Sequence, residues 1–246
     1  MYPVGEHGQM PSSNRLEDRT AVITGATRGI GAAVAERFAA EGAHVILVGR
    51  TQGGLEETDD RVRAAGGTAT LVPADLTDLD SIDNLGAAIA ERWGHLDILV
   101  GNAATLGVLS PIGHISLETW DDVFKLNVTV NWRLIRSFDA LLRKSTAGRA
   151  IFVTSGAASG VFPYWGAYSA SKAALESLAK VYAAEVASTS LRVNLIDPGA
   201  IRTNMRAQAF PGEDPMTLRA PEEITDSFVQ LAEIQCAHNG DIIRAF

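Results

Sequence analysis

The feature of this sequence that most constrains its fold is a regular alternation of short apolar runs with longer amphipathic segments. The runs lack the alternation of polar and apolar residues that marks a half-exposed strand, so both faces of each strand should be buried. Strands of this kind, separated by helices, form a parallel sheet covered on both sides. The predicted strands are residues 20–24, 44–48, 68–72, 96–100, 150–154, 191–196 and 241–244, and the predicted helices are residues 29–41, 54–65, 79–93, 117–142, 166–187 and 221–236.

This order predicts an α/β protein with a Rossmann-type, doubly wound parallel sheet of about seven strands. Ligands of such sheets bind at the carboxyl ends of the strands, so chemistry is expected just after the first, fourth, fifth and sixth strands. A length of 246 residues suits a single catalytic domain, which we place at residues 18–246. Residues 1–17 are rich in glycine, proline and serine and are predicted to form a flexible N-terminal arm.

Composition excludes several other classes of protein. The net charge of −8 argues against nucleic acid as a partner, and no apolar run is long enough to span a membrane. The first residues do not have the pattern of a secretory signal, and the single cysteine, Cys236, cannot form a disulfide within the chain. We therefore expect a cytoplasmic protein. No cluster of histidine, cysteine and acidic residues indicates a metal site.

A glycine-rich turn, Thr-Gly-Ala-Thr-Arg-Gly-Ile-Gly, follows the first strand at residues 24–31. Glycines permit a tight turn, and the start of the next helix offers free N–H groups to a pyrophosphate. The alternative is a plain strand-to-helix turn without a ligand. The preceding strand and the following amphipathic helix favour cofactor binding, with Gly25, Thr27, Arg28, Gly29, Ile30 and Gly31 as the candidate residues.

The end of the second strand indicates which dinucleotide binds. An acidic residue there would accept a hydrogen bond from the ribose 2′-hydroxyl of NAD, whereas NADP requires a cation for its 2′-phosphate. Gly49 stands where the acid would be, and Arg50 follows it. Arg28 can approach the same phosphate, although both arginines could instead be solvated surface charges. We therefore favour NADP(H) over NAD(H).

Two further strand ends carry candidate cofactor ligands. Asp75, followed by Leu76, comes after the third strand and could accept a hydrogen bond from the adenine amino group. Its alternative role is to cap the next helix, for which Thr77 and Asp78 compete. After the fourth strand, Asn102 and Ala103 lie in a small, flexible segment that lets a cofactor approach the backbone.

Tyr168 and Lys172 are the candidate catalytic pair. They lie four residues apart on a predicted helix, so both side chains project from one face. An adjacent ammonium group lowers the pKa of a tyrosine and makes it a usable acid or base near neutral pH. Ser155 ends the fifth strand, where its hydroxyl could hydrogen-bond the substrate oxygen that Tyr168 protonates.

In these motifs the sequence resembles the short-chain dehydrogenase/reductase family, in its compact single-domain branch. The resemblance covers nearly everything from residue 19 to residue 246. Gly101 and Ala104 depart from the usual Asn-Asn-Ala-Gly motif, but both residues are small, so cofactor binding should survive. Residues 165–168 and 205–215 resemble the YciK-like bacterial oxidoreductases within the family. The matching positions are Thr24, Gly25, Gly29, Gly31, Asp75, Asn102, Ala103, Asn127, Ser155, Tyr168, Lys172, Pro198, Gly199 and Thr203.

The resemblance implies a role for each residue of the catalytic set. Tyr168 would transfer the proton, Lys172 would lower its pKa and hold the nicotinamide ribose, and Ser155 would polarise the substrate oxygen. Asn127 would hold a water that links Lys172 to solvent. The nicotinamide itself would be contacted by Pro198, Gly199 and Thr203.

Three segments are expected to wall the substrate pocket: residues 105–115, 157–165 and 200–220. Their apolar residues suit a hydrophobic ketone, aldehyde or secondary alcohol, but each could instead pack in the core or at a subunit interface. The candidates for the wall are Leu106, Val161, Phe162, Trp165, Met205 and Phe210.

The function predicted from the sequence is NADP(H)-dependent hydride transfer to or from a small carbonyl or alcohol. The alternatives are an NAD(H)-linked alcohol dehydrogenase and a cofactor-binding regulator without turnover. The long helices at residues 117–142 and 166–187 are expected to pair across a two-fold axis, as in related proteins, which gives a homodimer or homotetramer.

Overall fold

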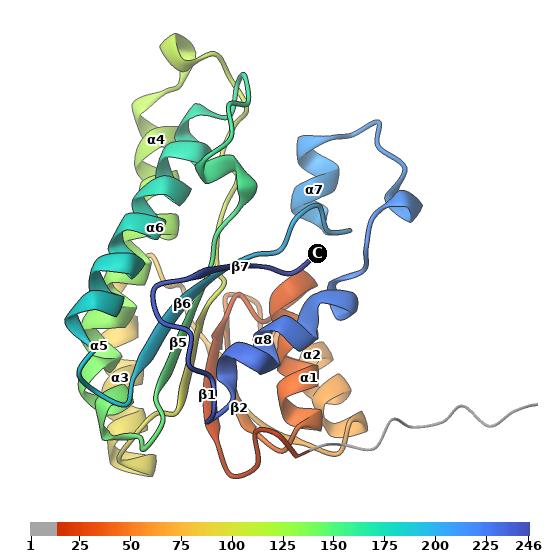
Figure 1. Cartoon of the computed structure of the whole chain (residues 1–246). Coiled ribbons are helices and arrows are strands. Elements are labelled where there is room, and N and C mark those ends of the chain that lie inside the picture. The colour runs from red at the N-terminus through yellow and green to blue at the C-terminus, as the bar shows by residue number, and fades with distance from the viewer. Residues whose placement is uncertain (1–13) are drawn as a thin grey trace, which may run out of the picture.

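A parallel sheet of seven strands forms the centre of the structure, a computed structural model that describes residues 14–246 (Figure 1). The strand order is β3-β2-β1-β4-β5-β6-β7, so the winding reverses between β1 and β4. This arrangement confirms the predicted Rossmann-type doubly wound sheet. The strands are β1 (Thr20–Thr24), β2 (His44–Gly49), β3 (Thr68–Pro73), β4 (Ile98–Gly101), β5 (Arg149–Val153), β6 (Arg192–Asp197) and β7 (Ile242–Arg244).

Helices cover both faces of this sheet, which is why the strands read as continuous apolar runs (Figure 1). One apolar cluster joins the sheet to α1, α2 and α8, and a second joins it to α3, α5 and α6. The edge strand β3 is only partly buried, whereas β1 is buried throughout. The helices on the first face are α1 (Gly29–Ala40), α2 (Gln52–Ala64) and α8 (Thr225–Ala232), and those on the second are α3 (Leu79–Trp93), α5 (Val130–Lys144) and α6 (Gly166–Glu185).

The single helix predicted for residues 117–142 is wrong in one respect, because the structure divides it. It consists of α4 (Leu117–Phe124), a π-helical segment, η2 (Lys125–Thr129), and α5. Asn127 lies in the π-helical segment and hydrogen-bonds to Thr105, which is 22 residues away. π-helical turns often occur at functional sites, and this one carries a candidate catalytic residue.

The last predicted helix is also shorter than expected. Residues 221–236 contain a 3-10 turn, η5 (Pro221–Ile224), followed by α8. The chain leaves helical geometry at Glu233, and Arg149 holds the turn that follows by donating to the main-chain oxygens of Glu233 and Ile234. The other predicted ends differ from the observed ones by at most two residues.

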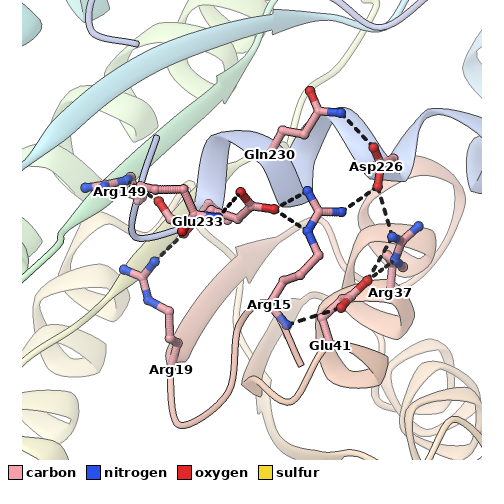
Figure 2. A network of polar contacts seen from close by, with 10 residues as sticks. Arg15, Arg19, Arg37, Glu41, Arg149, Asp226, Gln230 and Glu233 are labelled. Carbon is pink, nitrogen blue, oxygen red and sulfur yellow. Dashed lines mark hydrogen bonds and ion pairs between the residues drawn. The ribbon is translucent and has the colours of Figure 1, made fainter. Parts of the chain in front are cut away.

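The predicted boundary of the N-terminal arm at residue 17 comes too late in the chain. Leu16 is fully buried, and Arg15 forms ion pairs with Asp226 and Glu233. Figure 2 shows Arg15 extended toward α8, with Arg37 and Glu41 of the α1 end beside it. Residues 14–17 are therefore part of the folded domain, while residues 1–13 lie outside the described residues.

Candidate active site

The glycine turn after β1 forms a cradle that leaves room for a ligand. Gly25 has a φ of 65°, a conformation that favours glycine, and a side chain at Gly31 would collide with the main-chain oxygen of Gly25. No side chain caps the start of α1 at Arg28, so the first N–H groups of this helix are not occupied by a cap. A close backbone approach and free N–H groups fit a pyrophosphate.

Thr24 and Asn102 hold this turn in place. The Thr24 hydroxyl donates to Val100 O at 3.1 Å and accepts from the N–H groups of Asn102 and Ala103 at 2.9 and 3.1 Å. The Asn102 side chain donates to Thr24 O at 2.9 Å. Asn102 therefore supports the turn, and the structuring role of Thr24 was missed at the sequence level because its partners lie far along the chain.

The ends of β1 and β2 present two exposed arginines, Arg28 and Arg50. Gly49 lies between Arg50 and the buried part of β2, and a Cβ atom there would be 2.5 Å from Cγ2 of Thr27. A larger side chain at this position would therefore require the Thr27 side chain to shift. Arginine side chains at these strand ends can form charge-assisted hydrogen bonds with a phosphate group.

Asp75 and Leu76 follow β3. The Asp75 carboxylate accepts from the N–H and hydroxyl groups of Thr77 at 2.9 and 2.8 Å, and these hydrogen bonds, with a smaller contribution from Arg50, lower its pKa. Asp78 caps α3 by accepting from Asp80 N, so Asp75 is not the cap. Asp75 remains exposed, whereas Leu76 is buried in the core.

Tyr168 and Ser155 meet at the carboxyl end of β5. Tyr168 is only 8% exposed, and burial raises its pKa to about 12, partly offset by a hydrogen bond with Ser155. Ser155 also accepts from Ala157 N at 3.2 Å, which fixes its orientation. The buried phenol therefore stays protonated over the neutral pH range.

Lys172 lies one helical turn after Tyr168 and is 2% exposed. Its ammonium nitrogen lies 5.7 Å from the centre of the Tyr168 ring and donates to Val153 O at 2.8 Å. Burial lowers the pKa of Lys172 to about 8. The sequence predicts that Lys172 lowers the pKa of Tyr168, but in this structure burial dominates both groups and favours their uncharged forms.

Asn127 joins the π-helical segment to the pocket wall and to α6. Its side-chain oxygen accepts from Thr105 N at 2.9 Å, and its amide donates to Thr105 O at 2.9 Å and to Ser171 Oγ at 3.0 Å. Its main-chain oxygen accepts from Asn131. The side chain is thus engaged in holding residues 105 and 171, two partners that the sequence did not reveal.

The segment after β6 approaches the same site. Pro198 is buried, Gly199 has a φ of 72°, and Thr203 caps α7 (Asn204–Ala209) by accepting from Arg206 N at 3.2 Å. Asp197 ends β6, accepts from Gly199 N at 3.1 Å and contributes to the raised pKa of Tyr168. Asp197 is a further residue of the site that the motif comparison did not include.

The residues of the predicted apolar wall lie in three different environments. Leu106 is buried beside Tyr168, and Trp165 and Met205 pack against this small cluster. Val161 is 96% exposed and contributes no wall in this structure, because its segment projects from the surface. Phe162 and Phe210 line a pocket next to Trp165.

Residues 14–246 also bear on two other kinds of site. This part of the chain contains no group of three or more histidine, cysteine or acidic residues able to hold a metal ion. It also contains no helix that is both long and apolar enough to cross a bilayer.

Comparisons with known proteins agree with this geometry. Residues 19–214 match the family model described as short chain dehydrogenase. The uncharacterized oxidoreductase YciK of Escherichia coli (strain K12) is 35% identical over 224 residues, which are 90% of this chain and 88% of the relative. A short chain dehydrogenase structure from Pseudomonas syringae has a TM-score of 0.92 and 34% identity, covering 99% of this chain and 100% of the other.

A short chain dehydrogenase from Escherichia coli CFT073, solved in complex with NADPH, has a TM-score of 0.89 and 34% identity. The alignment covers 96% of this chain and 99% of that one. Sequence, fold and strand-end motifs thus agree over almost the whole chain. The chain belongs to the short-chain dehydrogenase/reductase family and is an oxidoreductase that acts on CH–OH or C=O groups with a nicotinamide cofactor.

Proposed function

We propose that this protein is an NADP(H)-dependent reductase or dehydrogenase of a small carbonyl or secondary alcohol, with Tyr168 as the proton donor and acceptor. The observation that carries the proposal is the convergence of Tyr168, Ser155 and Lys172 at the carboxyl end of β5, where all three are at least half-buried. The glycine cradle lies on the same edge of the sheet, as expected for hydride transfer beside a proton donor.

The bound nicotinamide would supply or accept the hydride. In the direction of reduction, the Ser155 hydroxyl orients the substrate oxygen and the Tyr168 phenol donates its proton to that oxygen. The raised pKa of Tyr168, about 12, keeps this proton in place until a substrate oxygen develops negative charge. A protonated Lys172 beside the ring favours the phenolate that remains.

The proton on Tyr168 must then be replaced from solvent. The resemblance assigns this relay to a water held by Asn127, whose side-chain amide is already engaged with Thr105 and Ser171. A carbonyl oxygen has two lone pairs, and the main-chain oxygen of Asn127 uses one for Asn131. We therefore assign the water to the main chain of Asn127 and a positioning role to its side chain.

The cofactor would be held by residues from several strand ends. The cradle would bind the pyrophosphate, Arg28 and Arg50 the 2′-phosphate, and Asp75 with Leu76 the adenine. Asn102 and Ala103 would lie along the cofactor, and Tyr168 with Lys172 would hold the nicotinamide ribose. The remaining proposed contacts are Gly25, Thr27, Gly29, Ile30 and Gly31 at the cradle and Pro198, Gly199 and Thr203 at the nicotinamide.

Cofactor preference is tested by titrating the protein with NADPH and with NADH. We expect NADPH to bind at least ~10-fold more tightly, because arginine and phosphate form a strong charge-assisted pair. Arg50→Ala should lose most of this preference while NADH binding changes little. The matched control is Arg63→Ala, which removes an exposed arginine from α2. Equal affinities in the unmodified protein would contradict an NADP(H) site.

We also propose a homodimer or homotetramer built on α5 and α6. Trp132 on α5 and Val181 on α6 are 42% and 55% exposed, which is unusual for large apolar side chains on neighbouring helices. Pairing these helices with a second copy would cover both. Sedimentation of the purified protein should give a dimer or tetramer, and a monomer would contradict the proposal.

A further inference from the structure

A pocket beside Trp165 is the feature of the site that the catalytic residues leave unexplained. Its volume is about 460 Å³, within the range of small-molecule sites. None of the residues that line it carries a charge. Four of them are aromatic, Phe162, Tyr164, Trp165 and Phe210, and the aliphatic ones include Leu109 and Ala209.

The pocket adjoins the proposed proton donor. Leu109, Trp165 and Ala209 line the pocket and also pack against the buried cluster that contains Tyr168. The rings of Trp165 and Tyr168 meet edge-on, with centroids 5.8 Å apart and an interplanar angle of 71°. A molecule in the pocket would therefore contact Trp165, whose ring packs directly against that of Tyr168.

Trp165 is the centre of the aromatic group. Its ring centroid lies 5.8 Å from that of Phe162 and 5.7 Å from that of Phe210, at tilted angles of 47° and 39°. Phe162 is 49% exposed and Tyr164 is 59% exposed, so these rings are not core residues. Half-exposed rings around an open pocket offer faces and edges on which a flat, apolar molecule can stack.

The backbone of this wall is held in an unusual conformation. Tyr164 has a φ of 74°, which residues other than glycine rarely adopt. Ser110 N donates to Tyr164 O at 3.0 Å, and Ser110 pairs with Trp165 in a short parallel bridge. Segments 105–115 and 157–165 thus brace each other, and strained backbone held in this way is typical of ligand sites.

The cation nearest to these rings is already neutralised. The Arg206 guanidinium lies 3.8 Å from the centre of the Phe210 ring and donates two hydrogen bonds of 2.6 Å to the Glu213 carboxylate. The hydrogen bond from Arg206 lowers the pKa of Glu213, so this acid stays charged at neutral pH. Arg206 therefore has no free charge with which to attract an anionic substrate.

We propose that this pocket takes uncharged, planar aromatic carbonyl compounds or the corresponding alcohols, and that the Arg206–Glu213 pair makes it reject carboxylates. This substrate class rests on the proposed oxidoreductase function.

The first test compares 2-acetylnaphthalene with 2-dodecanone, an open-chain ketone with the same number of carbons. Calorimetric titration of the NADP⁺-saturated enzyme measures binding without turnover. Phe210→Leu should weaken the binding of the naphthyl ketone about 5-fold, because a stacking ring is lost. The affinity for 2-dodecanone should change less than about 2-fold. The control variant is Trp93→Leu, which alters a tryptophan whose ring lies tilted against His44 at the amino end of β2. Equal losses for both ketones in Phe210→Leu would overturn the aromatic preference.

The second test adds 6-acetyl-2-naphthoate, which carries a carboxylate on the same ring system. The unmodified enzyme should bind it at least ~10-fold more weakly than 2-acetylnaphthalene, because a charge would enter an apolar pocket without a partner. Glu213→Gln frees the charge of Arg206 and should recover about 5-fold or more of that loss. Asp214→Asn is the matched control. It removes one negative charge, as Glu213→Gln does, but from a residue that caps a neighbouring turn. Similar recovery in both variants would overturn the role of the ion pair.

Turnover, measured as ketone-dependent oxidation of NADPH, separates the substrate class from the function on which it rests. Selective binding of 2-acetylnaphthalene without turnover would uphold the pocket and contradict the proposed reaction. Rapid reduction of 2-dodecanone with no preference for the naphthyl ketone would uphold the reaction and overturn the pocket's substrate class.

Discussion

Tyr168 and Lys172 are both buried, and burial moves their pKa values in opposite directions. It raises that of Tyr168 to about 12 and lowers that of Lys172 to about 8, because each group is easier to bury without its charge. The tyrosine therefore remains a proton donor throughout the neutral range. The lysine is the group whose charge changes near physiological pH.

This difference predicts a pH dependence of reduction. Below about pH 8 Lys172 is protonated and favours the phenolate left on Tyr168, and above it this charge is lost. We expect kcat/KM for carbonyl reduction to fall as the pH rises through about 8, since this ratio reports groups of the free enzyme. Lys172→Arg should remove the inflection because arginine stays charged, whereas a fall at the same pH in that variant would exclude Lys172 as its source.

The same burial has a cost for stability. The pKa of Lys172 is lower in the folded protein than its ordinary value of 10.5, so the charged lysine destabilises the fold below about pH 8. This cost shrinks as the pH rises from 8 toward 10.5. Lys172→Met should raise the free energy of unfolding at pH 7 by up to about 3 kcal/mol, and denaturant unfolding at pH 7 and pH 10 should show the gain shrinking. An equal gain at both pH values would contradict this explanation.

The place of the glycine turn between a strand and a helix was predictable, because it depends on neighbours in sequence. The turn follows β1 and leads into α1, and Gly25 lies close to Asn102 and Ala103. The roles of Thr24 and Asp197 depend on partners from other strands or on the burial of Tyr168, neither of which a local pattern contains.

At the scale of elements, the π-helical segment between α4 and α5 connects the proposed catalytic site to the pocket wall. The Asn127 side chain makes three hydrogen bonds, two to the main chain of Thr105 and one to Ser171. Asn127→Ala would leave these partners unsatisfied, two of them in or beside the wall. We expect it to lower the free energy of unfolding by about 2–3 kcal/mol and to reduce kcat/KM. Asn127→Asp keeps the acceptor for Thr105 N, so its losses in the free energy of unfolding and in kcat/KM should be smaller. An unchanged melting temperature for Asn127→Ala would contradict the role of these bonds.

The strands were predictable and this helical segment was not, for a physical reason. Burial on both faces makes each strand a continuous apolar run, which is visible locally. Periodicity over residues 117–142 persists through a π-helical turn, because the turn adds only a local irregularity. What positions that turn, the contact with Thr105, is not local. The early end of α8 at Ala232 depends in the same way on Arg149 of β5.

At the scale of the whole molecule, ion pairs at the amino end of the sheet join the start of the chain to α8 (Figure 2). Arg15 pairs with Asp226, 211 residues away, and Arg37 reaches the same carboxylate at 3.0 Å. Asp226 is half-exposed, so solvent weakens these pairs. No motif near residue 15 reveals such distant partners, which is why the arm was predicted to extend too far.

This network predicts a stability effect that leaves the site unaffected. Arg15→Ala should lower the free energy of unfolding by about 1 kcal/mol, more at low salt than at high salt, because several partners lose one cation. NADPH affinity should stay unchanged, since the network lies at the end of the sheet opposite the strand ends that form the site. Arg63→Ala removes a 72% exposed side chain that pairs with Asp59 on its own helix, so it should lower the free energy of unfolding less. A larger loss for Arg63→Ala would contradict the network's role.

The central claim is that Tyr168 delivers the proton in an NADP(H)-dependent reaction. The measurement that tests it most directly is kcat/KM for carbonyl reduction by Tyr168→Phe, together with its affinity for NADPH. We predict a loss of kcat/KM of about 100-fold or more, because the proton donor is gone, with NADPH affinity within about 3-fold of the unmodified protein. Undiminished turnover in this variant would contradict the account, since the substrate oxygen would then receive its proton from another group.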